Sequence, residues 1–305
     1  MKNIIQIISG LLLCSSLWGQ QLPLTESYFV DKYALSSAYA GNSDNKSLFA
    51  SYRRDWSGVS TGPRTFRLSY HDGFQSKAGI GGKMVFDKTG IFQQFFGMAT
   101  YTYRTEFVQD HFLFFGLSAG LYRNTLNFSN YYNDPNFTTD PTMINKDVKS
   151  KMKFVSDFSM VYSFKGIETG IMFTNINFGE ASYSDVSVKY RPLSNYQIHA
   201  SYTYALQQNW AFSPIVILRG GKDIGSQLEI AAQASYRKIV WASLIHRGKG
   251  VLGFGIGANP LKGIVFNYNY NLSSNITVNA FQNHEITLGL KLGEFLMKKE
   301  PVQEN

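Results

Sequence analysis

The sequence predicts an all-β protein: a transmembrane antiparallel β-barrel of about fourteen strands that follows an N-terminal signal peptide. Three observations predict this fold. An export signal begins the chain, apolar and polar residues alternate with period two from residue 47 onward, and the connections between alternating segments differ in length. The composition agrees, because 15% of the residues are aromatic and only 16% are charged. Aromatic residues are enriched in strands and at membrane interfaces.

The N-terminus has the pattern of a secretory signal peptide over residues 1–19. Lys2 supplies the positive start, residues 4–13 form an apolar core, and Gly19 offers a small residue for cleavage before Gln20. No other apolar run is long enough for a membrane-spanning helix. A helical membrane protein is therefore excluded, whereas a barrel of alternating strands is not.

The chain has a single cysteine, Cys14, which lies inside the expected signal peptide. Leu13 precedes it, whereas a lipidated cysteine normally follows a small residue, so lipidation is not expected. Cleavage would leave a mature chain without thiols. That excludes disulfides, thiol nucleophiles and cysteine-ligated metals together.

The formal net charge of +8 is spread along the chain. Short basic pairs such as Arg53-Arg54 and Lys298-Lys299 are scattered and form no stripe. Nucleic acid is therefore not an expected partner. The charge suits a membrane surface or a barrel lumen, and outer-membrane lipid is the expected environment.

Alternation recurs in about fourteen segments, each of the length that a tilted strand needs to cross an outer membrane. In the segment that starts at His111, for example, Leu117 and Leu121 share one face and Ser118 and Gly120 share the other. The segments are expected to begin near Ser47, Arg64, Ala78, Ile91, His111, Met152, Ile167, Ser194, Trp210, Gly225, Ile239, Val251, Gly263 and Gln282.

The connections support the barrel independently of hydropathy. With both termini in the periplasm, every second connection faces outward and is free to lengthen. The long connections, at 127–150, 175–193 and 272–279, all have this outward parity. Three boundaries follow: residues 20–46 precede the first strand as a periplasmic segment or a lumen plug, residues 47–292 form the barrel, and residues 293–305 form a short charged tail.

No catalytic or cofactor chemistry is expected. Gly79 to Lys83 lacks the spacing and the helix of a phosphate-binding loop, so its glycines, like those at 253, 255 and 257, are interpreted as structural. No histidines are spaced for a metal site. Ser243 and His246 are close in sequence but lie on opposite strand faces, and His199 is expected to be a solvated lumen residue.

Strand carboxylates could suggest a glycosidase, but balancing of lumen charge is the simpler interpretation. In this interpretation, the carboxylates of Asp157, Glu168 and Glu229 are balanced by the cations Arg67, Lys83 and Arg237. We therefore expect no enzyme, no cofactor and no metal.

Three stretches resemble the PorP/SprF family, the outer-membrane proteins associated with type IX secretion in Bacteroidetes. Residues 37–41 are similar to the family's Asn-Pro-Ala-Tyr-Ala-Gly, although Ser36-Ser37 stands where Asn-Pro is usual. Residues 52–65 resemble its Tyr-Arg, Trp-x-Gly and Pro-x-Thr pattern, and His284-Glu285-Ile286 its last-strand motif. The matching residues are Ala38, Tyr39, Ala40, Gly41, Tyr52, Arg53, Trp56, Gly58, Pro63, Thr65, His284 and Glu285.

The resemblance implies a multi-pass protein of the bacterial outer membrane with a non-enzymatic role. It would support secretion or surface anchoring of a partner protein, such as a gliding adhesin, beside periplasmic ring or motor components. It also implies structural roles: Trp56 as an interface anchor, Tyr39 and Gly41 in a plug or turn, and His284 with Glu285 at the barrel closure. The alternative is a passive transporter of small hydrophobic solutes, similar to the long-chain fatty-acid channels.

Overall fold

The computed structural model describes eleven stretches of the chain, residues 24–41, 46–74, 77–128, 148–177, 181–182, 189–190, 195–206, 209–221, 224–248, 250–273 and 282–293. The expected signal peptide, most of the connection at 127–150 and the tail beyond residue 293 lie outside these residues. Within them, no helix has both the length and the apolar character needed to cross a bilayer.

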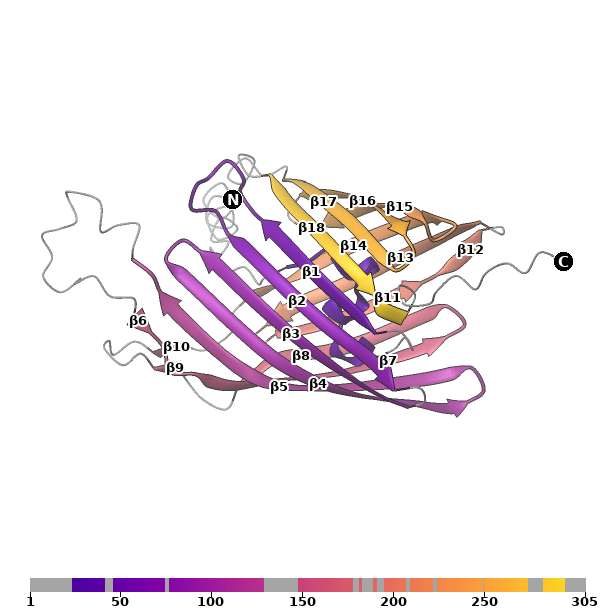
Figure 1. Cartoon of the computed structure of the whole chain (residues 1–305), viewed down its shortest axis with the longest axis horizontal. Helices are drawn as coiled ribbons and strands as arrows, with labels where there is room; N and C mark the ends of the chain where they lie inside the picture. Colours follow the sequence, from indigo (N-terminus) through magenta and orange to yellow (C-terminus); the bar gives the residue numbers. More distant parts are fainter. Residues whose placement is uncertain are drawn as a thin grey trace, which may run out of the picture.

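Fourteen long antiparallel strands form the wall of the barrel in the described part of the chain (Figure 1). They are β1 (Ser47–Arg54), β2 (Arg64–Phe74), β3 (Ala78–Thr89), β4 (Phe92–Val108), β5 (His111–Leu126), β7 (Lys153–Phe164), β8 (Ile167–Asn177), β11 (Asn195–Tyr202), β13 (Trp210–Gly221), β14 (Ile224–Tyr236), β15 (Val240–Arg247), β16 (Val251–Leu261), β17 (Ile264–Ser273) and β18 (Asn283–Lys291). Four short strands accompany them: β6 (Val148–Lys149), β9 (Ala181–Ser182), β10 (Lys189–Tyr190) and β12 (Tyr204–Leu206).

The barrel closes because its first and last strands pair with each other. β1 bonds to β2 on one side and to β18 on the other, with Arg53 opposite Glu285 and Ser47 opposite Lys291. The predicted barrel is confirmed. Each of the fourteen strands begins within one residue of its predicted start.

The outer face of the wall is apolar and the inner face is mixed. Along β15, Leu244 is 61% exposed, whereas its neighbours Ser243 and Ile245 are buried inside the barrel. The same alternation leaves Leu117 and Leu288 more than half exposed on β5 and β18. Large apolar side chains directed away from the lumen are what contact with lipid requires.

The two ends of the barrel differ in the length of their connections. Tight turns join β4 to β5 and β7 to β8 at the end where β1 begins. Positive φ angles at Asp110, Lys165 and Gly166 accommodate these turns. At the opposite end, 26 residues separate Leu126 from Lys153, as the parity of the sequence predicted.

A segment from Leu24 to Gly41, here called the plug, lies inside the barrel (Figure 1). Three short 3₁₀ helices form it: η1 (Ser27–Phe29), η2 (Lys32–Ala34) and η3 (Ser37–Tyr39). Side-chain oxygens cap two of them, because Asp31 accepts from the backbone N–H of Tyr33 and Ser36 accepts from that of Ala38. Such short helices turn the chain tightly enough to fit within the lumen.

We predict that an epitope inserted near Asn136, between β5 and β7, is labelled by antibody on intact cells. The reason is that this connection joins strands at the end opposite the start of β1. The matched control is the same epitope inserted between Lys165 and Gly166, which should be labelled only after permeabilisation. The reverse pattern would invert the orientation.

Candidate functional site

The plug and the lumen wall around it form the candidate site. Its apolar part packs Tyr28, Leu35 and Tyr39 against one side of the barrel. That wall consists of buried residues from β5, β7, β13, β14 and β15, namely Phe114, Val161, Ile215, Ile217, Ala231 and Ile245. Each fully buried side chain of this size contributes roughly 1.5–3 kcal/mol of hydrophobic free energy. Burial of apolar side chains therefore stabilises the plug in the lumen, as it stabilises the core of a globular domain.

Glycines on the inner face allow the plug backbone to approach the wall. A Cβ on Gly116 would lie 2.5 Å from the backbone nitrogen of Ala38, and one on Gly79 would lie 2.8 Å from the carbonyl oxygen of Ala40. Both positions therefore exclude any larger residue. By contrast, Gly253 and Gly255 face side chains of neighbouring strands.

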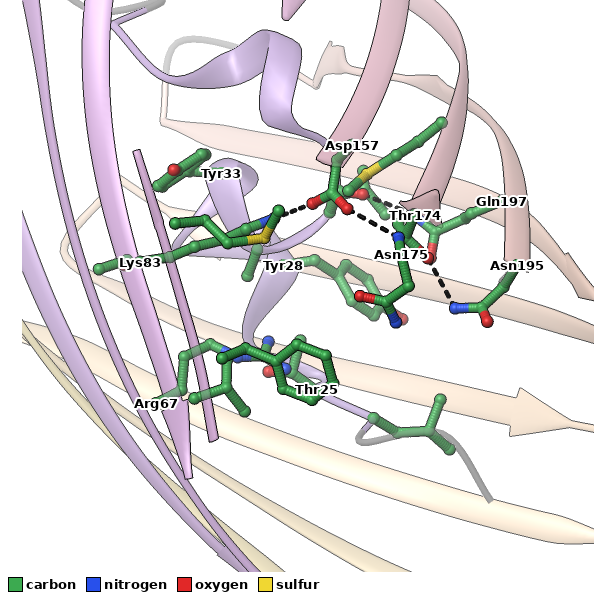
Figure 2. A pocket seen from close by; sticks show the side chains of 18 of the residues that line it. Thr25, Tyr28, Tyr33, Arg67, Lys83, Asp157, Thr174, Asn175, Asn195 and Gln197 are labelled. Atoms are coloured by element: carbon green, nitrogen blue, oxygen red, sulfur yellow. Dashed lines mark hydrogen bonds and ion pairs between the residues drawn. The ribbon is translucent and has the colours of Figure 1, made fainter. Parts of the chain in front are cut away.

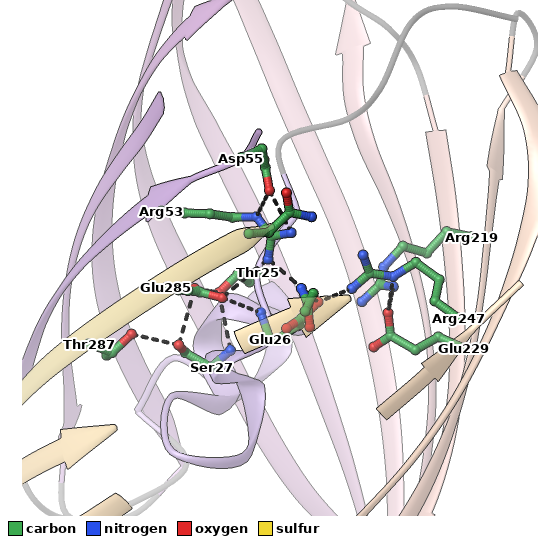
Figure 3. Close-up of polar contacts among 12 residues, drawn as sticks. Thr25, Glu26, Ser27, Arg53, Asp55, Arg219, Glu229, Arg247, Glu285 and Thr287 are labelled. Carbon is green, nitrogen blue, oxygen red and sulfur yellow. Dashed lines mark hydrogen bonds and ion pairs between the residues drawn. The ribbon is translucent and has the colours of Figure 1, made fainter. Parts of the chain in front are cut away.

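Glu285 on β18 is the central anchor of the plug (Figure 3). Its carboxylate accepts hydrogen bonds from the Thr25 hydroxyl, from the backbone N–H of Glu26 at 2.8 Å, and from the Ser27 hydroxyl at 3.1 Å. The side chain is 1% exposed. Because Arg53 is its partner across the β1–β18 pair, the same carboxylate joins the barrel closure to the plug.

Buried charges alternate in sign from this anchor across the lumen (Figure 3). Arg53 lies 3.5 Å from both Glu26 and Glu285 and 2.8 Å from Asp55. On the far side, Glu26 pairs with Arg247, whose Nε donates to Glu229 at 2.7 Å. The chain of charges ends at Arg219, which pairs with the same Glu229 and donates to Gln197.

A second set of contacts holds the plug toward the end of the barrel where β1 begins. Lys32 pairs with Glu168 at 2.7 Å, and the hydroxyl of Tyr39 donates to the same carboxylate at 2.9 Å. The Lys32 side chain is 47% exposed, so solvent screens this pair and it contributes at most about 1 kcal/mol. The buried network at Glu285 therefore matters more for retention of the plug.

Asp31 adds a buried acidic contact on the plug itself. The Ser69 hydroxyl of β2 donates to its carboxylate at 2.8 Å, and the N–H of Tyr33 donates at 3.1 Å. Burial raises the pKa of Asp31, while the charge of His71 and these hydrogen bonds oppose that increase. The Tyr33 hydroxyl lies 2.6 Å from that of Thr100, which extends the polar contact to β4.

The expectation of a solvated His199 was wrong. The residue faces the lumen as predicted, but it is only 1% exposed because Tyr39 of the plug covers it. The Tyr39 hydroxyl lies 3.1 Å from Nε2 of His199. Sequence alternation identifies the face of a strand but does not identify what covers that face.

The predicted balance of lumen charges was right in part. Asp157 pairs with Lys83 at 2.5 Å, as the sequence suggested. Glu229, however, pairs with Arg219 and Arg247. Arg237 does not enter the balance, because it lies at the turn after β14, where its Nε donates to Asn209.

The residues of the three family-like motifs lie in four places. Ala38, Tyr39 and Ala40 are buried in the plug, and Gly41 ends it with a φ of +76°. Arg53, Thr65 and Glu285 face the lumen, whereas Tyr52 is 46% exposed on the outer face. The remaining four residues, at and beyond the outer strand ends, are Trp56, Gly58, Pro63 and His284.

Three of these outer-end residues make hydrogen bonds near the strand ends. The carbonyl of Pro63 accepts from the backbone N–H of Asp55 at 2.9 Å. Trp56 has a φ of 54°, and its N–H donates to the Asn283 side chain at 3.0 Å, which joins the β1–β2 connection to β18. His284 lies 2.7 Å from the Tyr268 hydroxyl.

Sequence reasoning did not single out Thr25, Glu26 and Ser27, or their partner Arg247. Glu26 and Asp31 are the only carboxylates between Gln20 and Gly41. A carboxylate in a segment that the barrel encloses needs a cationic partner. If residues 20–46 are taken as a plug, the sequence therefore predicts that Glu26 pairs with a cation of the lumen wall.

A cavity of about 170 Å³ lies between the plug and the wall (Figure 2). Arg67, Lys83 and Arg219 line it together with Asp157 and several amide side chains. The strands contribute their halves nearer the long connections, as Thr174 of β8 and Asn195 of β11 illustrate. The Asn195 amide donates to Thr174 at 2.6 Å.

The structure does not bring together Ser243 and His246, the serine and histidine that lie close in sequence. Ser243 is buried in the lumen and His246 is exposed on the outer face, so the two cannot form a nucleophile–base pair. No group of three or more histidine, cysteine or acidic residues in the described part of the chain could hold a metal ion.

Comparison with known proteins identifies a family. The model of the family described as "Type IX secretion system membrane protein PorP/SprF" matches residues 18–290. No curated protein matches significantly.

Among solved structures, the Ralstonia pickettii toluene transporter TbuX is 10% identical, with 84% of this chain and 92% of the transporter covered and a TM-score of 0.48. The KdgM porin is 7% identical, with 80% of this chain and 98% of the porin covered and a TM-score of 0.41. A Rhodopseudomonas blastica porin variant is 9% identical, with 81% and 98% covered and a TM-score of 0.36. These structures are similar to the chain as barrels, and nothing about its function is taken from them.

We predict that Glu285→Gln lowers the free energy of unfolding by about 3 kcal/mol, because it removes one side of a buried charge pair. It also gives the three plug donors a weaker acceptor. Equilibrium urea unfolding of the protein in lipid vesicles measures the change.

The matched control is Glu106→Gln. That carboxylate is exposed and accepts from the backbone N–H of Asp110 in the β4–β5 turn, so its loss should change stability by less than about 0.5 kcal/mol. Equal stabilities of the two variants would contradict the role of Glu285 as an anchor.

Proposed function

Because the chain belongs to the PorP/SprF family of type IX secretion system membrane proteins, we propose that it supports secretion or surface anchoring of a partner protein without catalysing a reaction. The protein is an outer-membrane β-barrel associated with type IX secretion. The observation that carries the proposal is the family match over residues 18–290, which includes the plug and all of the barrel strands except the last residue of β18.

The partner that we propose is a secreted surface protein, with a gliding adhesin as one candidate class. Periplasmic ring or motor components of the secretion system are the second class of partner. The asymmetry of the barrel supports this assignment. Long connections join strands at the end that we assign to the secreted protein, while tight turns join strands at the other end.

We further propose that the family-like motif residues act structurally. Ala38, Tyr39 and Ala40 are each at most 2% exposed, so a partner cannot touch them while the plug is in place. Glu285 and Arg53 join the closing strands to the plug. Motifs that hold the plug and close the barrel would be shared by relatives whatever partner each one binds.

The lumen supports a holding role better than passive transport. The plug buries Tyr28 and Tyr39 against the wall and carries buried charge pairs, so a solute could pass only if these contacts broke. A transporter of small hydrophobic solutes therefore remains the second candidate, supported by the cavity beside the plug.

Deletion of the gene should remove one or more proteins from the cell surface while these proteins are still synthesised. Quantitative proteomics of surface-shaved cells and of whole cells measures both quantities. Crosslinking followed by affinity purification of the barrel should recover the same protein or periplasmic secretion components. An unchanged surface proteome would contradict the proposal.

Complementation with point variants separates anchoring from catalysis. His199→Gln keeps a hydrogen-bonding partner for Tyr39, and Ser243→Ala removes only a hydroxyl, so both variants should restore the surface proteins. If His199→Gln abolished function while the barrel stayed folded and bound to its partner, an enzyme or a transporter would replace the proposal.

A further inference from the structure

Arg67 lines the cavity beside the plug and has no bonded partner among the described residues. Its guanidinium, on β2, makes no hydrogen bond or ion pair with any residue that the structure describes. The other arginines of the lumen network, Arg53, Arg219 and Arg247, all pair with carboxylates. A guanidinium carries five N–H donors in a planar fork that matches a carboxylate, and in Arg67 all five remain available.

More cations than carboxylates line the cavity around Arg67. Three cations line it, Arg67, Lys83 and Arg219, against the single carboxylate of Asp157. Asp157 is already occupied, because Lys83 pairs with one of its oxygens and the backbone N–H of Asn175 donates to the other. The neighbouring Glu229 is likewise occupied by two arginines. Lys83 and Arg219 therefore have carboxylate partners, whereas Arg67 has none within ion-pair distance, and the carboxylates of Glu285 and Asp31 act on its charge only from farther away. The free N–H donors of Arg67 favour an acceptor such as a carboxylate.

The wall beside these cations is partly polar and partly apolar. Figure 2 shows Arg67 and Lys83 on one side of the cavity and Asn195 and Gln197 across from them. Apolar side chains from the plug and from β3, β4 and β8 complete the lining, namely Leu24, Leu35, Val85, Phe96, Met98 and Met172. A ligand that satisfies both parts of the lining has an anionic end and a small apolar body.

The volume limits the size of that ligand. About 170 Å³ is similar to the roughly 150 Å³ of an apolar cavity that binds a single benzene molecule. A single carboxylate with a short branched hydrocarbon group fits this space, whereas a polymer or a folded domain does not.

We propose that this cavity binds a monocarboxylate attached to a small apolar group, with Arg67 forming a bidentate contact to the carboxylate. Val85, Phe96 and Met172 cover the apolar group, and Asn195 lies across the cavity, while the Gln197 amide is already bonded to Leu35 and Arg219. The carboxylate could belong to a free acid or to the C-terminal residue of a peptide, because both present the same chemistry.

Calorimetric titration of the purified full-length protein in nanodiscs tests the proposal with N-acetyl-L-leucine as the probe. The neutral N-acetyl-L-leucinamide has the same shape without the charge, and it should bind at least about 10-fold more weakly. This comparison needs no protein variant. Equal affinity of acid and amide, or no binding of the acid, would overturn the proposal.

Variants of β2 locate the contact. Arg67→Gln should weaken binding of N-acetyl-L-leucine at least about 10-fold, and Arg67→Lys should weaken it less, because a lysine keeps the charge but not the fork. The matched control is Arg64→Gln on the same strand, which changes the net charge equally but removes an exposed side chain. Unchanged binding by Arg67→Gln and Arg67→Lys would show a solvated arginine only and would overturn the assignment.

A third probe distinguishes the two sources of the carboxylate. 4-Methylpentanoate carries the same branched group without the amide of a peptide. Comparable binding of both acids supports a free acid, and preferential binding of N-acetyl-L-leucine supports a peptide end. Ligand binding in this cavity goes beyond the proposed function. The titrations use purified protein and are therefore independent of the surface-protein experiment. Their failure leaves the surface-protein phenotype of the deletion untouched.

Discussion

A fourteen-stranded barrel encloses more space than its own inward-facing side chains can fill, and the rest of this structure depends on how that space is occupied. The plug occupies it with three 3₁₀ helices that bring eighteen residues into the lumen. Filling the space creates a second requirement. The polar groups that the plug and wall bury must find partners with each other, because water is displaced from around them.

Glu285 shows how a single residue meets both requirements. Its backbone belongs to β18 and lies opposite Arg53 of β1, where the sheet closes on itself. Its carboxylate accepts from three consecutive residues of the plug. The closure of the barrel and the seating of the plug therefore share one buried carboxylate, and a change there acts on both.

The charge network extends this coupling across the lumen. Glu26 of the plug lies between Arg53 of β1 and Arg247 of β15, on opposite sides of the network. Each arginine also has a carboxylate partner on the wall, at Asp55 and at Glu229. If the plug moved away, both arginines would lose one partner and keep another. The plug is thus bound strongly, yet its departure would leave no wall arginine of this network without a carboxylate.

The sequence predicted the wall well because lipid and lumen impose an alternation that local composition records. Leu117 against Ser118 and Leu288 against Thr287 identify the faces of their strands without knowledge of any partner. The contents of the lumen were less predictable. Glu229 was assigned to the correct face, but its partner Arg247, directly opposite on β15, was not singled out. His199 was also assigned to the correct face, but the side chain that covers it, Tyr39, belongs to the plug and is distant in sequence. This second contact depends on the path of the plug, which period-two patterning does not encode.

The central claim is that the plug fills and closes the lumen, and ionic conductance in planar lipid bilayers tests it most directly. The intact protein should give no steady porin-like conductance, whereas deletion of residues 24–41 should open a continuous ion-conducting pore. The deletion variant must retain heat-modifiable mobility on gels, which shows that its barrel has folded. A large, steady conductance of the intact protein, equal to that of the deletion variant, would contradict the account.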